Sequence, residues 1–102
     1  MEEENALQAL SALSNATRMQ LFKALVSAAP NGLTAGELAG KVDASPSRAS
    51  FHLSNLEAAG LVNSEKRARE ITYTARFDTM TALTRFILED CCSGQINIRD
   101  CC

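Results

Sequence analysis

Two short helices with clear start signals lie close together in the middle of the chain. Residues 34–37 have the form of a capping box, in which the side chains of Thr34 and Glu37 satisfy backbone N–H groups reciprocally. Ser45 suits the N-cap of the next helix, and Gly60 suits a left-handed residue just beyond its end. Because only about three residues join the two helices, the segment predicts a helix-turn-helix.

After Gly60 the pattern changes to that of strands. Residues 61–64 and 71–74 are rich in β-branched side chains, and the charged segment 65–70 separates them. This arrangement predicts a two-stranded hairpin with a basic tip, which we call the wing.

Further helices are expected on both sides of this unit. Leu7, Leu10 and Leu13 have helical spacing, Asn15 suits the N-cap of a second helix, and Asp78 suits that of the last helix. The expected fold class is mainly α with a small β-hairpin, a winged helix-turn-helix in the order α-α-α-α-β-β-α. Residues 1–92 should form this domain, and residues 93–102 should form a cysteine-bearing tail.

Bulk properties narrow the function classes. A chain of 102 residues with 46% hydrophobic and 22% charged residues suits one globular domain. The net charge is −2, but the segment 41–76 has more bases than acids, as a local nucleic-acid surface requires. No apolar run is long enough to span a membrane, and an acidic N-terminus is unlike a signal peptide, so a cytoplasmic location is expected. An enzyme is not expected, because no general base stands beside a nucleophile and no glycine-rich phosphate loop is present.

The segments LSALSNATRMQLFKAL, SRASFHLSNLEAAGLV and REITYTARFDTMTALTRFILEDCC resemble the ArsR/SmtB metalloregulatory repressors across nearly the whole chain. Phenylalanine before the helix histidine, together with paired cysteines closing the last helix, looks like the arsenic-responsive branch. The resemblance implies a homodimer that binds double-stranded operator DNA and is built mainly from the first and last helices. The alternative is that these two apolar faces pack within their own subunit. The candidate interface residues are Leu7, Leu10, Met80, Leu83 and Ile87.

The second helix of the helix-turn-helix is expected to present its N-terminal side chains to base edges in the major groove. Ser47, Arg48 and Ser50 are the candidates for bases, and Ser45 and Ser54 for phosphates. Arg48 can bind guanine through two hydrogen bonds or contact a phosphate only, and the sequence leaves both open.

Three further features of this surface follow from the comparison with the family. His52 matches the family's histidine, and in this position it suits packing or a phosphate contact better than metal ligation. Phe51 is expected to pack against the first helices, where many relatives have a basic residue. Ala68 stands where relatives often have glycine, so the turn of the wing can differ.

In the wing, the candidates for the phosphate backbone or the minor groove are Lys66, Arg67 and Arg69.

All four cysteines of the chain lie within twelve residues near its end: Cys91, Cys92, Cys101 and Cys102. Such a concentration is hard to explain by packing, because structural cysteines are usually buried and scattered. Trivalent arsenic or antimony prefers three thiolates, and either adjacent pair supplies two of them. The third thiol can come from the other pair across a short loop or from the partner subunit.

Other readings of the cysteines remain. They can form a transient disulfide that senses oxidants, or a Cys₄ site for zinc or cadmium, or a tail without function. Residues 37–43 align with the helix in which some relatives carry a Cys-x-Cys arsenic site, yet contain no cysteine, and the last helix lacks the Asp and His ligands of zinc-sensing relatives. The sequence therefore predicts a repressor that arsenic or antimony releases from DNA. A repressor answering to oxidants, zinc or cadmium is one alternative, and a metalloid-binding thiol protein that does not bind DNA is another.

Overall fold

The computed structural model describes residues 1–91 of the chain. Its elements are α1 (Glu3–Leu13), α2 (Ala16–Ser27), β1 (Leu33–Thr34), α3 (Ala35–Val42), α4 (Pro46–Ala58), β2 (Val62–Arg67), β3 (Glu70–Ala75), α5 (Phe77–Arg85) and a π-helical segment η1 (Phe86–Cys91). The order confirms the predicted winged helix-turn-helix.

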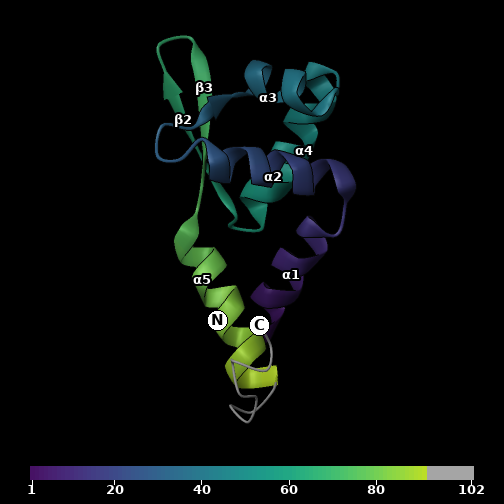
Figure 1. Ribbon diagram of the computed structural model, residues 1–102, viewed down its shortest axis with the longest axis vertical. Helices are drawn as coiled ribbons and strands as arrows, with labels where there is room; N and C mark the ends of the chain where they lie inside the picture. Colours follow the sequence, from purple (N-terminus) through teal and green to yellow (C-terminus); the bar gives the residue numbers. More distant parts are fainter. Residues whose placement is uncertain (92–102) are drawn as a thin grey trace.

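Helices α2, α3 and α4 and the sheet form the body of the molecule, and α1 and α5 extend from one end of it (Figure 1). The molecule is therefore elongated, with principal dimensions of 48 × 24 × 23 Å. Among the helices of the described residues, none combines the length and the apolar character that a membrane crossing requires.

The sheet has three antiparallel strands in the order β1-β3-β2. Strands β2 and β3 form the predicted wing, paired from Val62 opposite Ala75 to Arg67 opposite Glu70. The two-residue strand β1, which the sequence did not predict, adds Leu33 opposite Tyr73. The predicted hairpin therefore supplies two strands of a three-stranded sheet, and the third strand, β1, links the wing to the start of α3.

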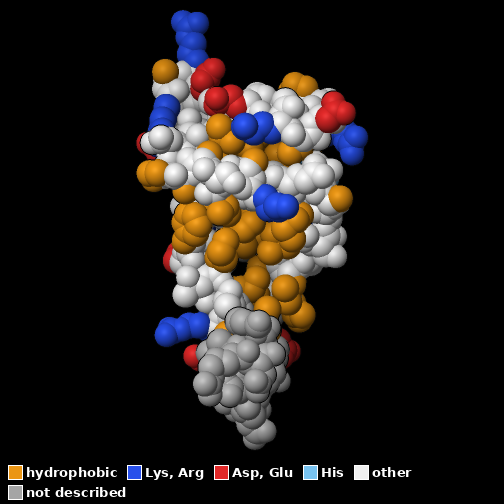
Figure 2. Space-filling view, viewed as in Figure 1, with side chains coloured by type: hydrophobic (Ala, Val, Ile, Leu, Met, Phe, Trp, Pro, Cys, Tyr) orange, Lys and Arg blue, Asp and Glu red, His pale blue; other side chains and the backbone are white. Residues whose placement is uncertain are grey.

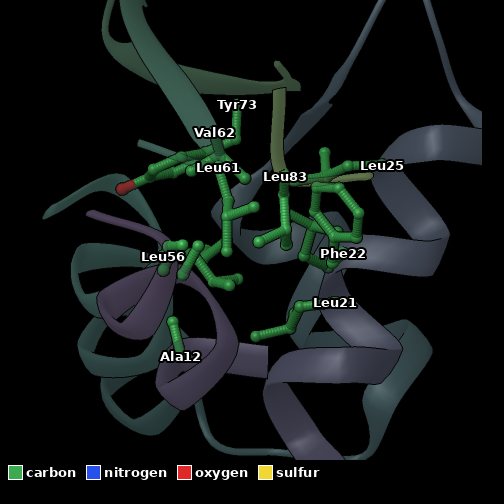
Figure 3. Close-up of a cluster of buried hydrophobic side chains, with 13 residues drawn as sticks. Ala12, Leu21, Phe22, Leu25, Leu56, Leu61, Val62, Tyr73 and Leu83 are labelled. Carbon is green, nitrogen blue, oxygen red and sulfur yellow. The ribbon is translucent and has the colours of Figure 1, made fainter. Parts of the chain in front are cut away.

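A single core joins the helices to the sheet. Side chains from α2, α4, the start of β2 and α5 converge there, as Figure 3 shows for Leu21, Leu25, Leu56, Val62 and Leu83. Helix α1 buries only its alanines in this core, namely Ala6, Ala9 and Ala12, and its last residue, Leu13, packs partly buried against the core. Small residues let α1 lie close to its neighbours, while the side chains of Leu7 and Leu10 remain exposed.

The predicted start signals are present at three of the four helices for which they were expected. The side chain of Asn15 accepts a hydrogen bond from the backbone N–H of Arg18 at 3.0 Å. Thr34 and Glu37 form both bonds of the capping box, at 3.2 and 2.9 Å. Asp78 is the exception, because α5 begins at Phe77 and Asp78 lies within its first turn. A carboxylate there still stabilises the positive end of the helix dipole.

Candidate nucleic-acid interface

The orientation of α4 is fixed by its cap and by its buried side. The Ser45 hydroxyl accepts a hydrogen bond from the backbone N–H of Arg48 at 3.2 Å, as predicted. Ala49, Leu53 and Leu56 are completely buried against the body. At the other end Gly60 has a φ of 80° and donates its backbone N–H to the carbonyl of Glu57 at 2.9 Å, which ends the helix in the predicted left-handed conformation. These constraints leave one side of α4 facing outward.

The outward side of α4 carries most of the candidate residues for DNA. It is exposed along its length, and it includes Ser47, Arg48, Ser50 and Ser54. Ser45 is exposed too, but its hydroxyl already serves the helix cap and lies 3.4 Å from the hydroxyl of Ser47. The structure thus groups these five predicted residues on one surface of the body.

His52 does not belong to that surface. Its side chain is only 9% exposed, and its Nδ1 lies 3.2 Å from Nη1 of Arg18. Arg18 in turn donates from Nε to the carbonyl oxygen of Ala12 at 2.6 Å, so the pair ties the end of α1 and the start of α2 to α4. Of the two roles that the sequence left open, His52 therefore has the packing role, and its predicted contact with a DNA phosphate is corrected.

Phe51 was expected to pack against the first helices, and this prediction is wrong. Its side chain is 65% exposed, because the neighbouring His52 and Leu53 take the buried positions of this turn. The aromatic ring lies on the outward side of α4 with the serines. Its exposure could have been found from the helical period, since Phe51 is four residues from Ser47 and three from Ser54.

The tip of the wing lies between Arg67 and Glu70. Lys66, Arg67 and Arg69 are all exposed there, as a contact with phosphates would need. Ala68 has a φ of 56°, the left-handed conformation that glycine adopts without strain. The turn that relatives often build with glycine is therefore made here with alanine.

Most of the candidate cations are free of acidic partners. Of the residues described, only two pairs form ion pairs, Arg67 with Glu65 at 3.2 Å and Arg76 with Asp78 at 2.8 Å. The first pair is strongly exposed, and such pairs contribute little to stability. Arg48, Lys66 and Arg69 thus have no ion-pair partner among the described residues that competes with an anionic ligand, and Arg67 can exchange its exposed partner at small cost.

A second surface is apolar and lies away from α4. Figure 2 shows hydrophobic side chains gathered below α2 and between α1 and α5. Leu7, Leu10 and Ile87 are exposed, and Met80 borders a hollow with Met19, Phe22 and Val26. Leu83, in contrast, is buried in the core of its own subunit. Four of the five predicted interface residues thus lie where another chain could reach them, and Leu83 belongs to the core.

The predicted metalloid site lies almost wholly outside the described residues. Cys92, Cys101 and Cys102 are beyond them, and of Cys91 the structure gives only its place as the last residue of η1. Within the described part of the chain, no three His, Cys, Asp or Glu side chains come together as metal ligands.

Comparison with known proteins places this geometry in a class. A family model described as a helix-turn-helix domain matches residues 13–65. The transcriptional activator HlyU of Vibrio cholerae is 33% identical over 88 residues, which cover 83% of this chain and 79% of that protein. The fold, the exposed side of α4 and these matches define a helix-turn-helix transcriptional regulator that binds DNA.

Solved structures refine the assignment. An ArsR-like transcriptional regulator from Rhodococcus sp. RHA1 superposes with a TM-score of 0.77 at 28% identity, over 88% of this chain and 82% of that one. A structure described as a possible transcriptional regulator for arsenical resistance has a TM-score of 0.69 at 29% identity, over 91% and 88% of the two chains. The chain belongs to the ArsR/SmtB family of transcriptional regulators.

Proposed function

We propose that this chain is a homodimeric repressor that binds operator DNA through α4 and the wing and is released when trivalent arsenic or antimony binds its C-terminal cysteines. The observation that carries the DNA-binding part is the outward side of α4, where short polar side chains and an unpaired arginine face solvent together. DNA as the partner implies action in the cytoplasm.

The DNA contacts follow from the shape of this surface. Ser47, Arg48 and Ser50 lie in the first two turns of α4, the part of a recognition helix that reaches base edges. The cations at the tip of the wing meet the phosphate backbone beside the groove, where they contribute affinity that is independent of sequence.

A second copy of the chain is the best occupant of the apolar surface. Leu7 is 59% exposed, and Leu83 is the only residue of α5 that is buried within its own chain. A helix with so little support gains burial when it packs against a partner. One structural neighbour, a winged helix-turn-helix domain from Mycobacterium bovis, is described as homodimeric. Dimerisation also supplies two recognition helices for two half-sites.

The effector is inferred from chemistry. Trivalent arsenic and antimony prefer thiolates, and the only thiols of the chain are Cys91, Cys92, Cys101 and Cys102. Cys91 ends η1, which continues α5, so a ligand held there would act on the helix that we assign to the dimer. Release then requires only that the bound form favour a dimer geometry that fits the operator less well.

The test is fluorescence anisotropy of the reduced full chain on a labelled duplex from its own upstream region, at fixed salt. We expect tight binding that arsenite abolishes and zinc does not. Replacing both Cys91 and Cys92 by serine should preserve binding and abolish the response to arsenite. If the double variant still releases DNA on addition of arsenite, the cysteine assignment is wrong. If the reduced protein binds no such duplex, a metalloid-binding thiol protein is favoured instead.

A redox-responsive regulator is the second candidate, because one similar structure is described as the reduced form of HlyU from Vibrio cholerae, at 30% identity and a TM-score of 0.66. The same assay separates the two effectors. Release by hydrogen peroxide that a thiol reductant reverses, without release by arsenite, would favour the redox candidate.

A further inference from the structure

The outward side of α4 carries one large apolar side chain among short polar ones. Phe51 is 65% exposed, with Ser47 one turn before it and Ser54 one turn after it. Serines are short, so on a surface that approaches another molecule the phenyl ring projects beyond them. An exposed phenylalanine in this position does nothing for the core, which Ala49, Leu53 and Leu56 already fill from the same helix.

The ring of Phe51 has a defined setting. It meets the ring of His52 edge-on, with centroids 5.5 Å apart and an angle of 65° between the planes. The His52 ring is itself held by Arg18, as described above. The backbone carbonyl of Phe51 also accepts a hydrogen bond from Nδ2 of Asn55 at 3.2 Å. The exposed ring therefore rests against the buried pair of His52 and Arg18. This contact restricts the ring, so less conformational entropy is lost when the ring contacts a ligand.

We propose that Phe51 reads sequence by contacting the 5-methyl group of a thymine in the major groove. The inference rests on the proposed function, in which α4 is the recognition helix. A phenyl ring offers no hydrogen bond, so against the polar edge of guanine, adenine or cytosine it would leave donors or acceptors unpaired. Thymine presents a methyl group in the major groove, and this is the apolar feature that matches the ring.

This contact would give the helix two kinds of base recognition side by side. Arg48 lies three residues before Phe51 on the same exposed side, where its guanidinium can reach a guanine or a phosphate. Phe51 would add preference for thymine without adding charge. Its contribution to binding is therefore independent of salt, unlike that of the arginine.

The experiment replaces thymine by uracil, which removes only the methyl group. A duplex is first selected from a random library by the full-length protein. Each thymine of that duplex is then replaced in turn by deoxyuridine, and Kd is measured by anisotropy at one fixed salt concentration. We expect one position in each half-site at which the loss of the methyl weakens wild-type binding roughly fourfold, the ratio for burying one methyl group.

Two variants assign the effect to a residue. Phe51→Ala should bind more weakly and show no loss at the sensitive positions. Phe77→Ala removes a phenylalanine that is 45% exposed on α5, and it should keep the wild-type pattern. All proteins are compared at the same low salt, where phosphate contacts keep weakened complexes measurable.

The outcomes separate this inference from the proposed function. If a duplex is selected but no uracil substitution weakens wild-type binding, Phe51 does not read a methyl group, and the DNA-binding role stands. The same conclusion follows if Phe51→Ala keeps the full uracil effect. If the library yields no duplex that the protein binds, the proposed function fails and this inference fails with it.

Discussion

The buried pair of His52 and Arg18 makes the stability of the fold depend on pH. An arginine side chain has donors only, so the bond between its Nη1 and Nδ1 of His52, 3.2 Å long, requires a lone pair on Nδ1. This bond therefore favours the neutral imidazole in the folded protein. Desolvation by burial, followed by the nearby charges of Arg18 and Arg48, lowers the pKa of His52 from its ordinary value of 6.5.

The sign of the effect follows from this shift. As the pH falls below about 6.5, the unfolded chain takes up a proton at His52 while the folded chain does not. The contribution to stability is complete above the unfolded-state pKa and is lost as the pH falls toward the folded-state pKa. Over that interval the free energy of unfolding should decrease by up to about 1.4 kcal/mol per pH unit.

The assay uses the fact that the chain has one histidine. Urea unfolding of the full chain is followed by circular dichroism between pH 8 and pH 5, at one protein concentration because a dimer is expected. His52→Asn is the matched variant, since the asparagine carbonyl can accept the bond from Arg18 but cannot titrate. We expect the variant to show a flatter dependence of stability on pH over this range.

Two results would refute the reasoning. One is a His52 ring that titrates at or above 6.5 in the folded protein, as measured by NMR of its ring protons. The other is a pH dependence that is equally steep in His52→Asn, which would assign the effect to other groups. Glu37 and Asp78 do not account for a pH dependence between pH 8 and pH 5. Hydrogen bonds from Thr34 and Arg76, respectively, lower the pKa values of their carboxyl groups further below this range.

Three more predictions follow from the surfaces. Leu7→Asp should weaken the dimer at least tenfold in sedimentation equilibrium while the helix content of the chain stays unchanged, because the Leu7 side chain is exposed in the single subunit. Arg48→Ala should lower DNA affinity and reduce the slope of log K against log salt by about one if the side chain meets a phosphate, whereas Lys23→Ala on α2 should change neither. Ala68→Gly should raise the free energy of unfolding in urea by up to about 1–2 kcal/mol, the cost of a Cβ at a φ of 56°, and Ala68→Val should lower it, because a β-branched residue is more strained there than alanine.

Local chemistry made much of the fold predictable. Thr34, Ser45 and Asn15 each bind a backbone N–H within three residues, so their caps are visible in the sequence without knowledge of the rest of the chain. Gly60 likewise indicates a residue with a positive φ at the end of the helix. The position of the recognition helix, and hence most of its exposed serines, followed from these signals.

Features that depend on distant partners were less accessible. Strand β1 has two residues and exists because Leu33 and Thr34 pair with β3, nearly forty residues later. The wing could be predicted from its two neighbouring strand segments and the turn between them. The third strand could be predicted only from its pairing with residues far along the chain. The inward position of His52 also depends on a distant residue: the helical period places Phe51 with the exposed serines, but hydrophobicity favours burying Phe51 rather than its polar neighbour. A polar residue is tolerated there because Arg18, from another helix, satisfies it.

The joint at Arg76 connects the two ends of the proposed mechanism. Arg76 stands between β3 of the wing and the start of α5, and its side chain grips Asp78 in the first turn of α5 at 2.8 Å. Its backbone N–H donates to the carbonyl of Leu61 at 2.9 Å, and Leu61 lies in the short connection between α4 and β2. In the proposed mechanism, a rotation of α5 against the body would therefore act next to the segment that joins α4 to the wing. An effector held at the end of η1 would then act on α4 and the wing through α5 and Arg76.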